Sequence, residues 1–316
     1  MENIRIPIGE WVDVVFDWFK ENLDWLFDFF TFLFRFLIES LTEVLVDLHP
    51  LVIMILLALI GWVLRSWQMA VGTLIAMFFV MTMDQWVASM QTLALIIIAA
   101  LIAIVIAIPV GILAARNDTV SAVVRPILDF MQTMPAFVYL IPAVTFFSIG
   151  VVPGLVSTVI FALPPGVRFT ELGIRGVDSE TVEAGQAFGA TPGQILRGVQ
   201  LPLATPTIMA GINQVIMLAL AMAVIAGFVG ADGLGKNVVE AVATQNLPLG
   251  VEAGLGVVII AVYLDRVTAA LGTAKDYPNS LLGKLKRRNS AQAEARSKAE
   301  ADDAAKAAAL AHPAQG

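Results

Sequence analysis

The chain has 316 residues, of which 58% are hydrophobic and only 14% are charged. A soluble domain of this length does not keep so much apolar surface, so the composition predicts an all-α integral membrane protein. The absence of cysteine excludes disulfides, thiolate catalysis and cysteine-ligated metals. The net charge is −7, and we expect no nucleic-acid partner.

The sequence gives little support to an enzyme. Its two histidines, His49 and His312, are far apart and in unlike surroundings, and no set of nucleophile, histidine and acid is visible. We therefore expect no catalytic residue, no metal site and no cofactor in this chain.

Residues 1–49 predict an amphipathic helix that lies in the membrane interface and precedes the spans. At about 100° per residue, one face collects acids and another collects tryptophans at every seventh position. These residues are Asp13, Asp17, Glu21, Asp24 and Asp28, and Trp11, Trp18 and Trp25. We interpret the helix as an external scaffold whose acidic face is solvated; a contact with cations or a partner protein is the alternative.

About seven later stretches are apolar enough to be spans. Two accessory spans are expected within residues 50–88, and the remaining ones form a core over residues 89–272. The uncharged stretch 130–167 would be about 57 Å long as one helix, so it must turn, and we expect the turn at residues 150–154. The expected spans are 50–64, 66–83, 85–115, two within 130–167, 198–231 and 251–272.

The charges predict an orientation. If the spans alternate, most basic residues of the loops fall on one side, whereas the acidic residues 1–49 fall on the other. By the positive-inside rule, the N-terminus is outside and the C-terminus inside. The polar, alanine-rich tail 273–316 is expected to be cytoplasmic and disordered.

A polar island at residues 178–202 interrupts the apolar stretches. Asp178 is expected to cap a first helix that runs through Phe188, and Gly189 suits the left-handed position after it. Thr191, with Pro192 after it and Gln194 three residues on, predicts the capping box of a second helix. We expect Leu201 and Pro202 to end that second helix.

These residues resemble the "EAA" loop of ABC importer permeases. The family pattern is Glu-Ala-Ala, three residues, Gly, nine residues, then Ile-x-Leu-Pro, and Gly185 and Val199 are the two departures here. The blocks at 131–144, 161–177, 201–222 and 230–242 further resemble the glycine betaine and proline betaine permeases of osmoprotectant uptake. This likeness extends from about residue 93 to residue 271.

The resemblance implies the fold of a type I ABC importer transmembrane domain and its partners. It implies two permease chains, cytoplasmic ABC ATPase subunits that bind ATP and Mg, and a substrate-binding protein outside. In that family the loop is the coupling helix that docks on the ATPase. The residues it assigns to coupling here are Glu183, Ala184, Gly185, Gly189, Leu201 and Pro202.

Several uncharged polar or thioether side chains lie in or beside the spans. Such groups usually bond to neighbouring helices, but they are also suited to line a pathway, because weak neutral contacts let a zwitterion pass without trapping it. The candidates are Gln132, Met134, Tyr139, Asn213, Gln214 and Met217.

Other functions stay open. An ABC permease for choline, trimethylamine N-oxide, methionine or another amino acid would share the coupling loop. An ion-coupled secondary transporter would need an ionisable group deep in a span, and none is evident from the sequence. A structural membrane scaffold would not need the coupling loop.

Overall fold

The computed structural model describes residues 7–272 and residue 280; all but one residue of the expected tail 273–316 therefore lies outside the described residues. The described residues form helices and contain no strand, as an all-α membrane protein requires. In chain order the elements are α1 (Ile8–Asp47), α2 (Pro50–Leu64), α3 (Trp67–Thr82), α4 (Trp86–Arg116), α5 (Asp118–Thr133), η1 (Ala136–Tyr139), α6 (Leu140–Phe147), α7 (Val151–Arg175), α8 (Ser179–Ala187), α9 (Pro192–Ile195), η2 (Leu196–Gln200), α10 (Leu201–Ile225), η3 (Ala226–Val229), α11 (Leu234–Thr244) and α12 (Leu247–Gly272).

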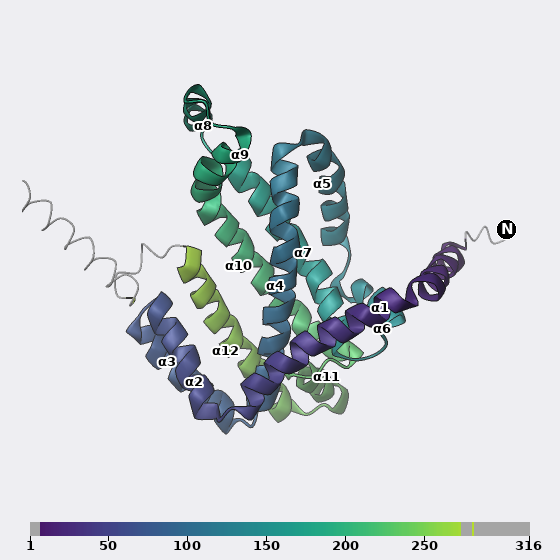
Figure 1. Ribbon diagram of the computed structural model, residues 1–316. Helices are drawn as coiled ribbons and strands as arrows, with labels where there is room; N and C mark the ends of the chain where they lie inside the picture. The colour runs from purple at the N-terminus through teal and green to yellow at the C-terminus, as the bar shows by residue number, and fades with distance from the viewer. Residues whose placement is uncertain (1–6, 273–279, 281–316) are drawn as a thin grey trace, which may run out of the picture.

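Four of these helices are long and apolar enough to cross a membrane, or up to six within the described residues if each bent pair is one span. The expected number, about seven, counted α2 and α3 as one span each. They have only 15 and 16 residues, so each is about 24 Å or less in length. That length is short of a hydrocarbon core of about 30 Å. The two helices pack against each other as a hairpin beside α12 (Figure 1).

The residues before the expected turn at 150–154 do not form one straight helix. The turn is present, because α6 ends at Phe147 and α7 begins at Val151. However, the chain is already broken at Pro135, where α5 and the η1–α6 segment meet at 107°. Proline lacks a backbone N–H and disfavours helical geometry in the residue before it, and Met134 is indeed extended. The helix α5, amphipathic and mostly exposed, was not expected from the sequence.

Helices α4, α7 and α10 form the centre of the bundle, and α8 and α9 project from one end of it, opposite α11 (Figure 1). The main core is made of aliphatic side chains from these three helices and α12, among them Leu93, Leu155, Val215 and Ile260. Many large apolar side chains point outwards instead, as expected for helices that face lipid.

Hydrogen bonds satisfy backbone groups at the break at Pro135 and at the turn before Val151. The Tyr139 hydroxyl donates to the carbonyl of Met131, which lies on the far side of the break at Pro135, and the Ser157 hydroxyl donates to the carbonyl of Tyr139 at 3.2 Å. At the next turn, the N–H of Gly150 donates to the carbonyl of Val229 at 2.9 Å. The carbonyls of Met131 and Tyr139 and the N–H of Gly150 are therefore bonded to protein at these breaks.

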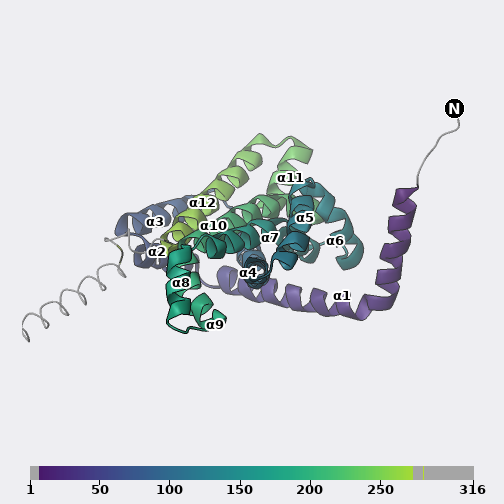
Figure 2. The same ribbon diagram turned by 90° about the horizontal axis from the view of Figure 1, so that it is seen from above.

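The N-terminal helix forms as predicted, from Ile8 to Asp47, and it is bent at Leu23. Figure 2 shows its two arms. The second arm packs on the bundle through Ile38, and the bend places Phe16 and Phe27 on Phe146 of α6, with ring centroids 4.9 and 4.5 Å apart. The three tryptophans of the first half are more than half exposed, as an interfacial helix requires.

Gly111 of α4 lies where α4 approaches α7 closely. A Cβ atom on Gly111 would lie 2.5 Å from the Cβ of Thr170 and 2.8 Å from the carbonyl oxygen of Val167. We predict that Gly111→Ala lowers stability by about 1–3 kcal/mol, the usual cost of overpacking. The measurement is the thermal unfolding midpoint of the purified chain in detergent.

The matched control for this prediction is Gly254→Ala in α12, where a Cβ atom would meet nothing within 4 Å. Its midpoint should be unchanged or slightly higher, because glycine within a helix costs about 0.5–1 kcal/mol relative to alanine. Equal midpoints for the two variants would show that α4 and α7 are not in the close contact described.

Candidate functional site

The polar island of the sequence forms a short helical hairpin, α8–α9, at one end of the bundle (Figure 1). The turn is made by Gly189, whose φ of +79° lies in the left-handed region that favours glycine. The next helix begins with the predicted capping box: the Thr191 hydroxyl accepts from the N–H of Gln194, and the Gln194 side chain accepts from the N–H of Thr191 at 2.8 Å. Local sequence thus determines the shape of this hairpin.

Two predictions about its ends are wrong. Asp178 precedes α8 but makes no capping bond to the backbone; its carboxylate accepts from the Thr181 hydroxyl at 3.1 Å instead. Leu201 and Pro202 do not end the second helix, because the chain continues from α9 through the π-helical turn η2 into α10. Pro202 lies in the first turn of α10, where a missing N–H costs little.

The residues assigned to coupling differ in exposure. Glu183, Ala184, Gly189 and Pro202 are exposed, whereas Gly185 and Leu201 are partly buried. Sequence reasoning did not single out Phe188, the residue after α8, whose side chain is 93% exposed. A large aromatic side chain left in solvent on a polar hairpin indicates a contact surface. Its position directly before Gly189 was the available signal.

An apolar cluster holds η2, the helical turn that directly follows the hairpin, to the bundle. It consists of Ile174 near the end of α7, Leu196 in η2 and Ala204 in α10, with partly buried neighbours packed around them. Because α9 continues into η2, a displacement of the hairpin would reach the ends of α7 and α10 through this cluster.

The candidate pathway residues do not all share one surface. Gln132 and Gln214 are exposed, and Met134 and Met217 are partly buried. Tyr139 is buried and its hydroxyl bonds to Met131.

The side chain of Asn213 is hydrogen-bonded to α12. Its amide donates to Asp265 of α12 at 3.2 Å, and its carbonyl accepts from the Thr268 hydroxyl. Of the polar candidates, the two glutamines therefore keep side chains free to meet a passing solute.

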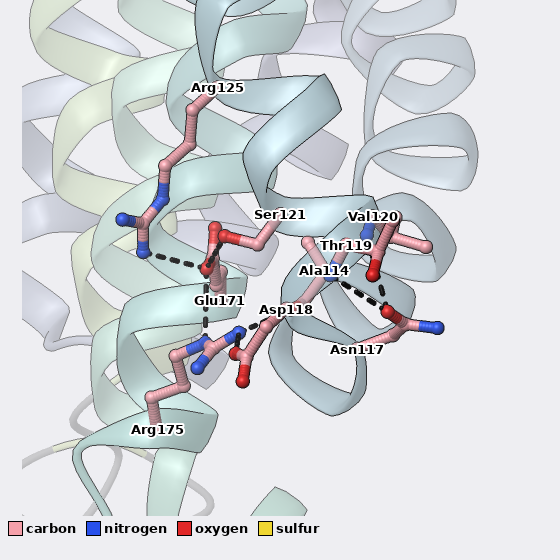
Figure 3. Close-up of polar contacts among 9 residues, drawn as sticks. All are labelled: Ala114, Asn117, Asp118, Thr119, Val120, Ser121, Arg125, Glu171 and Arg175. Atoms are coloured by element: carbon pink, nitrogen blue, oxygen red, sulfur yellow. Dashed lines mark hydrogen bonds and ion pairs between the residues drawn. The ribbon is translucent and has the colours of Figure 1, made fainter.

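A carboxylate lies deep in the contact between α5 and α7 (Figure 3). Glu171 is in α7, and its side chain is only 5% exposed. Its Oε1 atom accepts from the Ser121 hydroxyl at 2.7 Å and from Nη2 of Arg125 at 2.9 Å, both on α5. Nε of Arg175, one turn further along α7, lies 3.0 Å from the same oxygen.

Arg175 extends this network to a third helix. Its Nη2 atom donates to the carbonyl of Ala114 in α4 at 2.8 Å and to Asp118, the first residue of α5, at 2.7 Å. A second ion pair joins Arg168 of α7 to Asp129 of α5. Arg125, Asp129, Arg168, Glu171 and Arg175, with Leu172, line a cavity of about 340 Å³.

Glu171 is a buried ionisable group that the sequence analysis did not identify, and it lies one turn before the end of α7, not at the middle of a span. The sequence analysis ended the second apolar stretch at residue 167, but α7 continues as a helix to Arg175. Its charges are tolerated because each has a partner on α5 or on α7 itself. A signal was present in the spacing of Glu171 and Arg175, which are four residues apart and thus on one helix face.

Within residues 7–272, no group of three or more histidine, cysteine, aspartate or glutamate side chains could hold a metal ion.

Comparisons with known proteins identify the family. Residues 107–274 match the model of the binding-protein-dependent transport system inner membrane component family. The glycine betaine transport system permease protein OpuAB of Bacillus subtilis is 45% identical over 271 residues, which cover 86% of this chain and 96% of the relative. The glycine betaine/proline betaine transport system permease protein ProW of Escherichia coli is 42% identical, with 85% of this chain and 78% of the relative covered.

A solved structure agrees. The fold matches a chain of the MetNI methionine ABC transporter, in an inward-facing conformation, with a TM-score of 0.54 and 25% identity over 58% of this chain and 92% of that one. The chain is therefore a multi-pass membrane protein with the fold of a type I ABC importer permease, and it belongs to the binding-protein-dependent transport system inner membrane component family.

Proposed function

We propose that this chain is the permease subunit of an ATP-driven ABC importer for glycine betaine, proline betaine or a related quaternary amine osmolyte. The observation that carries the proposal is the exposed hairpin α8–α9, with Gly189 at its turn, in a chain 45% identical to a glycine betaine permease. That relative is matched over 96% of its length, which supports a shared role for the chain as a whole.

The hairpin is the surface that meets the ATPase, and it lies in the cytoplasm. Helices α4 and α7 both end in an arginine, and η2 carries another, whereas the opposite end carries the acidic α1. By the positive-inside rule this charge difference supports an N-terminus outside and a C-terminus inside the bacterial cytoplasmic membrane.

The complete transporter contains two permease chains, which we propose to be identical. Two ATPase subunits bind ATP and Mg at the cytoplasmic face, and a substrate-binding protein delivers the osmolyte at the outer face. ATP binding brings the ATPase subunits together and moves both hairpins. The apolar cluster around Ile174 and Leu196 passes that movement to α7 and α10, so the pathway opens outwards.

The exposed face of α10 supplies part of the pathway. Leu203, Ala210, Gln214 and Ala221 are exposed at intervals of four or seven residues, as positions on or near one helical face are. Gln214 is the polar side chain among them. A neutral amide offers a zwitterion a weak bond, which favours release over tight binding.

Transport is the first test. Proteoliposomes that contain this chain, the ATPase and the binding protein encoded beside it, and internal ATP should take up labelled glycine betaine. Uptake should need both partners and should be competed by proline betaine or choline, with methionine as the non-competing control. Uptake driven by an ion gradient without ATP would contradict the proposal.

Phe188 tests the docking surface. We predict that Phe188→Ala weakens binding of the ATPase to the purified chain by about tenfold or more, because exposed aromatic anchors commonly contribute about 2 kcal/mol or more. The control is Gln186→Ala, an exposed position one turn or less away. Affinity can be measured by titrating labelled ATPase into the chain in nanodiscs; equal affinities for both variants would exclude Phe188 as an anchor.

Gly189 tests the shape of the hairpin. Gly189→Asp should reduce ATP-driven uptake by about tenfold or more while membrane insertion persists, because a left-handed conformation costs a side chain about 1–2 kcal/mol and the turn must hold two helices in register. Gly193→Asp adds the same charge in the same hairpin at a position without a left-handed φ. Equal losses of uptake would assign the effect to charge and not to the turn.

A further inference from the structure

Helix α5 has few attachments to the rest of the chain. Its only buried residues are Ser121 and Leu128. Leu128 packs in a small apolar cluster with Ala107 and Val167, and Ser121 bonds to Glu171. The contact of α5 with α7 therefore combines this apolar cluster with polar bonds, which are the bonds to Glu171 and the ion pair of Asp129 with Arg168.

The bonds to Glu171 are hard to break one at a time. The carboxylate is nearly excluded from solvent, so loss of its cationic partners would leave a buried charge uncompensated. Arg125 of α5 and Arg175 of α7 therefore stay with it, and Arg175 is also bonded to α4 through Ala114. These charge-assisted bonds connect the ends of α4, α5 and α7 through one buried carboxylate.

The network lies between two parts of the chain that must communicate. Arg175 is the last residue of α7, and α8 begins at Ser179, so the network is about one turn from the hairpin. At its other end, α5 leads to Met134 and the break at Pro135, beyond which the chain turns by 107°. The exposed Gln132, a candidate pathway residue, lies at that end of α5.

We propose that Glu171 is a positioning residue for transport: it fixes α5 to α7, so that a displacement of the α8–α9 hairpin reaches the break at Pro135. This inference rests on the proposed function, because it names the route by which the ATPase acts on the pathway. Without the link, α7 and α10 follow the hairpin through their apolar contacts while α5 lags behind.

The first experiment compares uptake with ATP hydrolysis in the complete transporter. Glu171→Gln keeps the shape and one acceptor of the side chain but removes its charge. It should keep the complex assembled and hydrolysing ATP, and it should lower osmolyte uptake per ATP hydrolysed about tenfold, within the usual range of coupling between sites. Glu171→Asp, which restores the carboxylate, should recover part of the ratio.

A second variant tests the same link in case Glu171→Gln does not fold. Arg125→Gln removes the cation on α5 while Arg175 still neutralises Glu171, and it should lower the ratio about fivefold. Asp84→Asn is the matched control: it removes an exposed carboxylate far from the network, and asparagine tolerates its left-handed φ of +57°. An unchanged ratio in Glu171→Gln, or loss of hydrolysis and uptake together in both network variants, would overturn the inference.

A distance measurement tests the link without reference to the substrate. The chain has no cysteine, so pairs of introduced cysteines can carry spin labels without background. Val123→Cys on α5 and Gln186→Cys on α8 are each paired with Val242→Cys on α11, and all three positions are exposed. With the ATPase bound, ATP should change both distances in the native background. In Glu171→Gln the α8 distance should still change and the α5 distance should not; equal changes in both would overturn the inference.

The two experiments separate the inference from the proposed function. If the wild-type transporter fails to take up glycine betaine, the substrate assignment fails, but the label distances still report whether α5 follows α8.

Discussion

A bilayer offers no hydrogen-bond partner to a peptide group, and this constraint determines where the chain can leave a helix. The break at Pro135 and the turn before Val151 both lie within stretches that the sequence makes continuously apolar. Each is accompanied by bonds from a neighbouring element: Tyr139 reaches back to Met131, and Gly150 bonds to Val229. At both places a polar group of the protein bonds to backbone that has left the helix. A transporter needs such places, because straight helices alone cannot rearrange around a solute.

The low polarity of the bilayer also explains why the charged side chains between the helices are paired. Transfer of the Glu171 carboxylate into hydrocarbon would cost free energy, but Ser121, Arg125 and Arg175 bond to it and compensate its charge. Through these bonds the carboxylate connects α5 and α7, and Arg175 extends the connection to α4. Asn213 and Asp265 form a similar, less buried junction between α10 and α12. Apolar packing, which is nearly uniform between helices in lipid, could not specify these contacts as sharply.

Features that depend on residues close together in the sequence could be predicted, whereas features that depend on distant residues could not. Gly189 and the Thr191 capping box were predicted correctly, because each depends on residues within a few positions. The α1 helix was predicted from its periodicity. The end of α7 was not, because the partners of Glu171 on α5 lie 46 and 50 residues earlier in the chain. The sharp turn of 107° at Pro135 was not predicted, although a proline there marks the end or a bend of a span. Asp178 was predicted to cap the backbone of α8, but its carboxylate accepts from the Thr181 hydroxyl instead.

The contact of α1 with Phe146 has a consequence for biogenesis. Phe16 and Phe27 are made long before the residue they enclose, so the first helix cannot complete its packing until α6 has been inserted. During that interval an all-apolar helix would enter the bilayer or aggregate. A helix with one acidic face and a row of tryptophans can wait at the membrane surface instead. Its amphipathic pattern therefore suits the order of synthesis as well as the final structure.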